Sequence, residues 1–105
     1  MNSVTQALCD FIGIPLVADI TNEHNIALVE QWRDGTVVPD VDQLETIVFT
    51  WFMLQEITAH RCEDTARAWF TKDNESLFGR TPADAVKEGD LYDVQVAARK
   101  EIMGK

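Results

Sequence analysis

The side chains able to do nucleophilic or metal chemistry are few and lie far apart in the sequence. Cys9 and Cys62 have no CxxC spacing, and His24 and His60 are isolated. A nucleophilic triad needs a histidine beside a nucleophile and an orienting acid, and a zinc site needs paired ligands on one face. The five glycines are dispersed, so they form no phosphate cradle. We therefore expect no enzymatic activity, metal or cofactor, and two reduced thiols instead of a disulfide.

Length, composition and charge favour one compact protein that acts on a partner. The 105 residues are 46% hydrophobic, which suffices for a real core without disulfides. The N-terminus has no basic region before an apolar core. The longest apolar run, 47–54, is interrupted only by Thr50 and is shorter than the roughly 20 residues of a membrane span. We therefore expect a cytoplasmic protein. The net charge of −9 repels polyphosphate and acidic membranes and favours basic partners.

The first forty residues predict three short helices. Apolar side chains recur at helical spacing over 4–12, and shorter helices follow over 16–20 and from 26 to near Gly35, with a polar turn over 21–25 between them. A short helix, a turn and a helix make the helix-turn-helix arrangement. Residues 1–40 are therefore expected to form a helix-turn-helix-like region, and 41–105 to complete one compact all-α unit.

A long helix is expected from Val41 to about Ala59, with Asp40 as its N-cap. Steps of three and four residues predict a core stripe of Val41, Leu44, Val48, Trp51 and Leu54. The middle of this helix is apolar around most of its circumference, which a domain of this size can seldom bury. We expect a homodimer interface at Phe49, Trp51, Phe52 and Met53. The alternative is that this helix runs through the centre of the domain.

The last forty residues alternate between helices and tight turns. The helix after Glu63 buries Trp69, and in the polar loop that follows Asn74 can bond to its own backbone. Leu77 and Phe78 are expected to return to the core as apolar plugs.

Four further residues predict the boundaries of the last two helices. Thr81 caps a helix that Pro82 opens, Gly89 ends it, and Asp90 caps the final helix.

Two stretches resemble the Xre/MbcA/ParS antitoxin family. The C-terminal toxin-binding domain of that family is similar in the spacing of Trp69, Asn74, Leu77, Gly79, Thr81, Pro82, Ala85 and Gly89. Residues 18–40 resemble its degenerate Xre-type helix-turn-helix, which ends in a tryptophan, here Trp32, then a glycine and a proline. In that resemblance Ala18, Val29 and Trp32 are core positions.

The resemblance implies an antitoxin that binds a RES-type, NAD-consuming toxin and blocks its active-site entrance, with the helix-turn-helix region able to repress the operon. The implied toxin contacts are Arg80, Asp84, Tyr92, Arg99, Lys100 and Lys105. Buried residues such as Trp69, Leu77, Pro82, Ala85 and Val94 would hold that surface in shape.

DNA binding would be weak for the isolated acidic chain. Residues 1–40 carry one basic and six acidic side chains, a net charge of −5, whereas phosphate contacts need cations. A DNA-reading helix would use Asn25, Leu28, Gln31 and Arg33. Two alternatives stay open: a small helix-turn-helix transcriptional regulator, and a solitary antitoxin-like protein of a mobile element or phage that binds a host protein.

Overall fold

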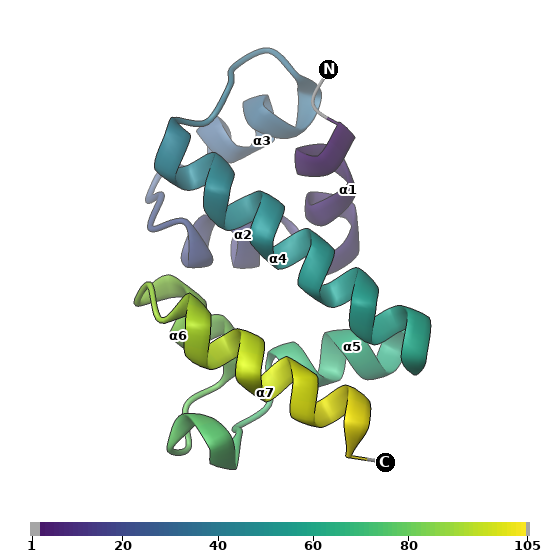
Figure 1. Ribbon diagram of the computed structural model, residues 1–105. Coiled ribbons are helices and arrows are strands. Elements are labelled where there is room, and N and C mark those ends of the chain that lie inside the picture. The colour runs from purple at the N-terminus through teal and green to yellow at the C-terminus, as the bar shows by residue number, and fades with distance from the viewer. Residues whose placement is uncertain (1–2, 105) are drawn as a thin grey trace. The chain divides into compact units, whose positions relative to one another are not determined.

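The computed structural model describes residues 3–104, and every regular element in that range is helical. The elements in Figure 1 are α1 (Ser3–Ile12), α2 (Ile14–Ile20), α3 (Ile26–Asp34), α4 (Val41–His60), α5 (Glu63–Phe70), the 3₁₀ helix η1 (Glu75–Leu77), α6 (Pro82–Lys87) and α7 (Leu91–Met103). The predicted all-α class is confirmed. Within this range, no helix is both long and apolar enough to cross a membrane.

The chain divides into two units by its internal contacts, unit 1 (Met1–Trp51) and unit 2 (Phe52–Lys105). The division falls inside α4, so the first half of this helix belongs to unit 1 and the second half to unit 2. The sequence-based division at residue 40 follows the loop before α4 instead, and it stays a prediction.

Unit 1 is built around α1, α2 and α3, which pack on one another. The backbone passes from α1 into α2 at Gly13, whose φ of 96° lies in the left-handed region that favours glycine. Pro15 occupies the first turn of α2, where a missing N–H costs no helical hydrogen bond. In these three helices the largest fully buried side chains are Leu8, Val17, Ile20, Val29 and Trp32.

The expected short helix, turn and helix are present as α2, residues 21–25 and α3. Asn25 caps α3 by accepting a hydrogen bond from the Leu28 N–H, and Gly35 ends the helix with a φ of 84°. The burial of Ala18, Val29 and Trp32 confirms that they are core positions. A role of this arrangement on DNA stays a prediction.

Helix α4 begins as predicted, but it buries a different face. Asp40 Oδ1 accepts from the Gln43 N–H at 2.8 Å, and Gln43 Oε1 accepts from the Asp40 N–H at 3.2 Å, which is a reciprocal capping box. The buried positions are Ile47, Thr50, Met53, Leu54 and Ile57. Of the predicted stripe, Leu54 is fully buried and Leu44, Val48 and Trp51 are half-buried, whereas the prediction is wrong for Val41, which is 72% exposed. Apolar residues surround the middle of α4, so periodicity alone could not select the face.

Unit 2 packs its helices on small and aromatic side chains. Ala66, Phe70, Leu77, Ala85 and Val94 are fully buried, and α6 and η1 both pack against α7. Because Ala66 and Ala85 are small, the helices that carry them can approach closely, and Phe70 and Leu77 supply apolar volume.

Candidate interaction surface

The loop between α5 and α6 is closed by hydrogen bonds that centre on Asn74. Its Oδ1 accepts from the Ser76 N–H at 2.9 Å, its own N–H donates to the Arg80 carbonyl at 2.9 Å, and its carbonyl accepts from the Gly79 N–H at 3.0 Å. The predicted role of Asn74 is therefore confirmed, and Gly79, with a φ of 88°, completes the turn. The loop presents its side chains from a fixed backbone.

Leu77 is fully buried, whereas Phe78 is 90% exposed. The expectation that both side chains return to the core is therefore wrong for Phe78. Its backbone is left-handed, with φ 61° and ψ 36°, and this conformation ends η1 and turns the following chain. The sequence does not reveal Phe78 as a surface residue, because an aromatic residue rarely adopts this conformation.

Helix α6 has the boundaries that its sequence predicts. Thr81 Oγ1 accepts from the Asp84 N–H at 3.0 Å, and Pro82 opens the helix. The helix ends at Lys87, and Gly89, whose φ is 87°, turns the chain just after it, where the Asp90 N–H donates to the Ala85 carbonyl at 3.0 Å.

Arg80 joins this loop to the α6–α7 junction. Its Nη1 donates to Glu88 Oε1 at 2.6 Å and to Asp90 Oδ2 at 2.7 Å, and its Nε donates to the Leu77 carbonyl at 3.1 Å. The carboxylates of Asp90 and Glu88 raise the pKa of the Arg80 guanidinium. Asp90 stands at the N-cap position of α7 but makes no capping hydrogen bond with its side chain. The predicted cap is wrong because its carboxylate pairs with Arg80.

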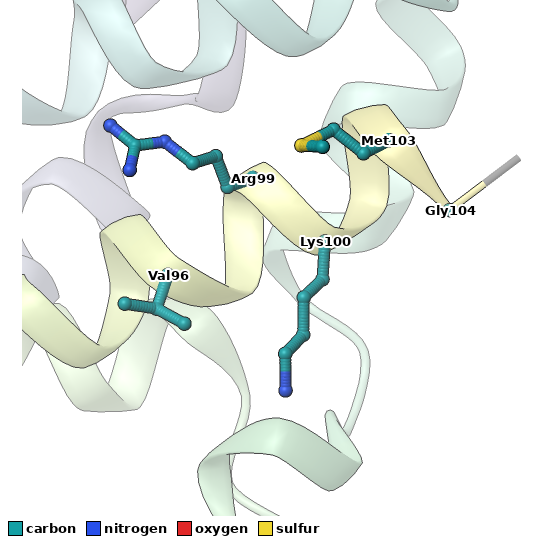
Figure 2. Close-up of a pocket in the computed structure, with 5 residues that line it drawn as sticks. All are labelled: Val96, Arg99, Lys100, Met103 and Gly104. Atoms are coloured by element: carbon teal, nitrogen blue, oxygen red, sulfur yellow. The ribbon is translucent and has the colours of Figure 1, made fainter.

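Helix α7 has one buried and one exposed face. Val94, Ala97 and Ala98 are buried, whereas Tyr92 and Met103 are 76% and 77% exposed. An open cavity of ≈ 410 Å³ is lined by Val96, Arg99, Lys100, Met103 and Gly104. Figure 2 shows Arg99 and Lys100 extending to different sides of the helix. Tyr92, Val96, Arg99 and Met103 follow helical steps of four, three and four residues along this exposed face.

The C-terminal part of α7 is tied to two other parts of unit 2. Lys100 Nζ lies 3.5 Å from Ser76 Oγ in η1. Arg61, which follows α4, donates from Nη2 to the Glu101 carbonyl at 2.6 Å, and its Nε lies 3.8 Å from Glu101 Oε2. These contacts satisfy a carbonyl at the C-terminal end of α7 and neutralise Glu101, so Arg61 fixes the position of the helix end.

Positive charge is concentrated in unit 2. Unit 1 contains one basic and eight acidic residues, a formal net charge of −7, whereas unit 2 contains eight basic and ten acidic residues, a net charge of −2. In unit 2, Arg67 pairs with Asp64 and Arg80 pairs with Glu88 and Asp90. Arg99 forms no ion pair with any residue in 3–104. The end of α7 is therefore a locally cationic surface on an acidic protein.

The expected toxin contacts are placed as follows. Asp84, Tyr92, Arg99 and Lys100 have exposed side chains on α6 and α7, whereas Arg80 is engaged within the chain. Lys105 lies outside the described residues. Their contact with a toxin stays a prediction.

The residues predicted to read DNA or to form a dimer lie on α3 and α4. Asn25, Gln31 and Arg33 are exposed and Leu28 is half-buried. On α4, Met53 is buried, Trp51 packs edge-on against Phe11 with ring centroids 5.9 Å apart, Phe49 is half-buried and Phe52 is 60% exposed. Their functions stay predictions.

The two cysteines occupy different environments, and neither forms a disulfide. Burial raises the pKa of Cys9 to about 11. Cys62 is exposed, and its hydrogen bond with the Thr65 hydroxyl, at 3.2 Å, lowers its thiol pKa. No group of three or more His, Cys, Asp or Glu side chains within residues 3–104 could hold a metal ion.

The fold and the site define an all-α protein with a rigid loop and an exposed, locally cationic terminal helix. No protein-family model and no curated protein sequence matches the chain. Its structure is similar to a chain in the crystal structure of the M. tuberculosis MbcT–MbcA toxin–antitoxin complex, with a TM-score of 0.80 and 23% identity. The similarity covers 98% of this chain and 94% of that chain. The resemblance to the Xre/MbcA/ParS family is therefore confirmed at the level of the fold.

Proposed function

We propose that this protein is an antitoxin that binds a cognate toxin through unit 2. The observation that supports this most strongly is the fold that it shares, over 98% of its length, with a chain of a toxin–antitoxin complex. The family resemblance of the Trp69-to-Gly89 pattern points to a RES-type toxin that consumes NAD. The complex would act in the cytoplasm, where such a toxin meets the cell's NAD.

The proposed mechanism is steric occlusion rather than catalysis. The loop closed by Asn74, helix α6 and the exposed face of α7 form the toxin-facing surface, and Arg99 and Lys100 lie closest to the toxin's active-site entrance. This mechanism is supported by the rigidity of the surface, because Arg61 and Arg80 fix its two ends before any partner binds. A preorganised surface loses little conformational entropy on binding.

The direct test is co-expression with the reading frame adjacent to this chain's gene. We expect that product alone to arrest growth and deplete NAD, and co-expression of this chain to restore growth and yield a purified complex. If growth is restored without a complex, steric inhibition is wrong. If the neighbouring product is harmless and does not bind this chain, the hypothesis of an antitoxin encoded beside its toxin is wrong. A solitary antitoxin-like protein then becomes the better hypothesis.

We further propose self-association through α4. An open apolar cavity of ≈ 410 Å³ is lined by Val41, Leu44, Glu45, Val48 and Phe49. Further along the same helix Phe52 is 60% exposed. Burying these side chains against a second copy would remove apolar surface from water. Light scattering should give a dimer for the wild-type chain and a monomer for Phe52→Glu, and a monomeric wild type would contradict the proposal.

Helix α3 carries the residues that operon repression would use. The exposed Asn25, Gln31 and Arg33 of α3 support it, whereas the net charge of −5 over residues 1–40 opposes it. We expect the isolated chain to leave its promoter fragment unshifted at about 0.15 M salt, and any DNA binding to require a partner that supplies positive charge. A shift at ~10 nM chain alone would instead favour a transcriptional regulator.

A further inference from the structure

The exposed Phe78 ring is unusual in both its exposure and its backbone. The side chain is 90% exposed, and its φ of 61° is one that residues other than glycine rarely adopt. Holding a bulky residue in this conformation strains the backbone, and the surrounding structure must offset that strain. Packing within the described part of the chain does not account for a phenylalanine at this position, because its ring is almost fully exposed.

The surrounding hydrogen bonds over-determine this conformation. The Phe78 N–H donates to the Glu75 carbonyl at 3.1 Å, and the Arg80 N–H donates to the Leu77 carbonyl at 3.2 Å. Leu77, immediately before it, is fully buried and anchors the turn. The ring therefore projects from a rigid support, as an aromatic residue must if it is to insert into a partner without further ordering.

The ring belongs to the same part of unit 2 as the α7 surface. η1 packs against α7, and Ser76, two residues before Phe78, lies 3.5 Å from Lys100. Figure 2 shows the Lys100 side chain extending toward the neighbouring short helical turn. We call the set of Phe78, Val96, Arg99, Lys100 and Met103 the anchor patch. It combines one rigid aromatic side chain, aliphatic side chains and two cations.

We propose that the anchor patch docks onto an apolar pocket rimmed by carboxylates on the toxin, with Phe78 as its aromatic anchor. The charge complementarity supports this occupant, because Arg99 and Lys100 are cationic and the nearby Glu101 carboxylate pairs with Arg61. A second copy of this chain is the alternative occupant, and the oligomeric state of the isolated chain distinguishes it from the toxin. The inference rests on the proposed antitoxin function and adds the identity of the anchor and the chemistry of its pocket.

The test uses Phe78→Gly in the full chain, because glycine suits a φ of 61° and should keep or raise the melting temperature. Calorimetry with the purified product of the adjacent reading frame should show a Kd raised about 30-fold. Ile26→Ala, which removes an exposed apolar side chain of unit 1, should stay within about threefold of the wild type. Phe78→Tyr, which keeps the aromatic ring, should also bind within about threefold.

The carboxylate rim is tested by salt. Raising NaCl from about 0.05 to about 0.5 M should weaken wild-type binding, and Lys100→Gln should show a smaller salt dependence.

Three results would overturn the inference. If a folded Phe78→Gly variant binds within threefold of wild type, Phe78 is not the anchor, and the proposed antitoxin function is unaffected. A change in the oligomeric state of the isolated chain on this substitution would assign the patch to a second copy. If the wild-type chain does not bind the neighbouring product at all, both the role of Phe78 as an anchor and the proposed function are wrong.

Discussion

In unit 2 the Asn74 side chain is hydrogen-bonded, whereas the indole N–H of Trp69 is not. Asn74 Oδ1 accepts from the Ser76 N–H. The Trp69 side chain is 8% exposed, and its buried Nε1 has no hydrogen-bond partner among the described residues. An unpaired indole N–H loses its bonds to water without replacing them. Trp69 therefore stabilises unit 2 through the packing of its ring.

Trp69→Ala should lower the free energy of unfolding by roughly 3 to 5 kcal/mol, because it removes a buried ring and leaves a cavity. Trp69→Phe keeps most of the apolar volume and removes the unpaired N–H, so it should cost much less. Urea denaturation of the three proteins checks this. An unchanged midpoint for Trp69→Ala would mean that the ring is not part of the core.

Cys9 should make stability fall in alkaline solution. The pKa of its thiol is about 11 in the folded chain against 9.0 for an exposed thiol, so between these values the unfolded chain has released a proton that the folded chain retains. Unfolding therefore becomes easier as pH rises from about 9 to about 11, and this thiol has no effect below about 8. Melting temperatures of wild type and Cys9→Ala across this range check it, and equal slopes would contradict it.

For the helices, local sequence rules predicted most of the ends, whereas tertiary contacts determine which faces are buried and which side chains pair. Asp40 and Thr81 cap α4 and α6 as expected, because a cap depends on residues within about three positions. The buried face of α4 depends on which helices pack against it, and the Asp90 carboxylate depends on an arginine ten residues earlier. Those contacts connect residues that no local pattern relates.

The same limit applies to the candidate site. The exposed Tyr92 and the buried Trp69 and Leu77 follow from the family-like spacing of the C-terminal third. Phe78 could not be assigned, because in sequence it stands beside Leu77 with the same apolar character, and only the backbone turn separates their environments.

Arg80→Gln should loosen the junction between α6 and α7 without unfolding unit 2. The substitution removes the ion pairs to Glu88 and Asp90, and amide exchange should speed up at Asp90 and Leu91. Toxin affinity should fall further than for Arg67→Gln, which removes exposed ion pairs within α5. Equal exchange rates in wild type and Arg80→Gln would show that the ion pairs do not order this junction.

The charge distribution of the whole molecule predicts that salt has opposite effects on the two proposed associations, self-association and toxin binding. Self-association through α4 brings Asp42, Glu45 and Glu56 of two copies together, so salt should strengthen it by screening their repulsion. Toxin binding through Arg99 and Lys100 should weaken instead. Sedimentation and calorimetry between about 0.05 and 0.5 M NaCl measure the two trends, and parallel trends would contradict the proposed surfaces.

The most direct measurement of the proposed function is NAD consumption by the purified product of the adjacent reading frame in the presence of this chain. We expect equimolar wild-type chain to stop NAD loss, the double substitution Arg99→Glu and Met103→Glu on α7 to leave it running, and Arg33→Glu on α3 to inhibit as wild type does. Full inhibition by the α7 double variant, or none by the wild type, would contradict an antitoxin that works by covering the toxin with its terminal helix.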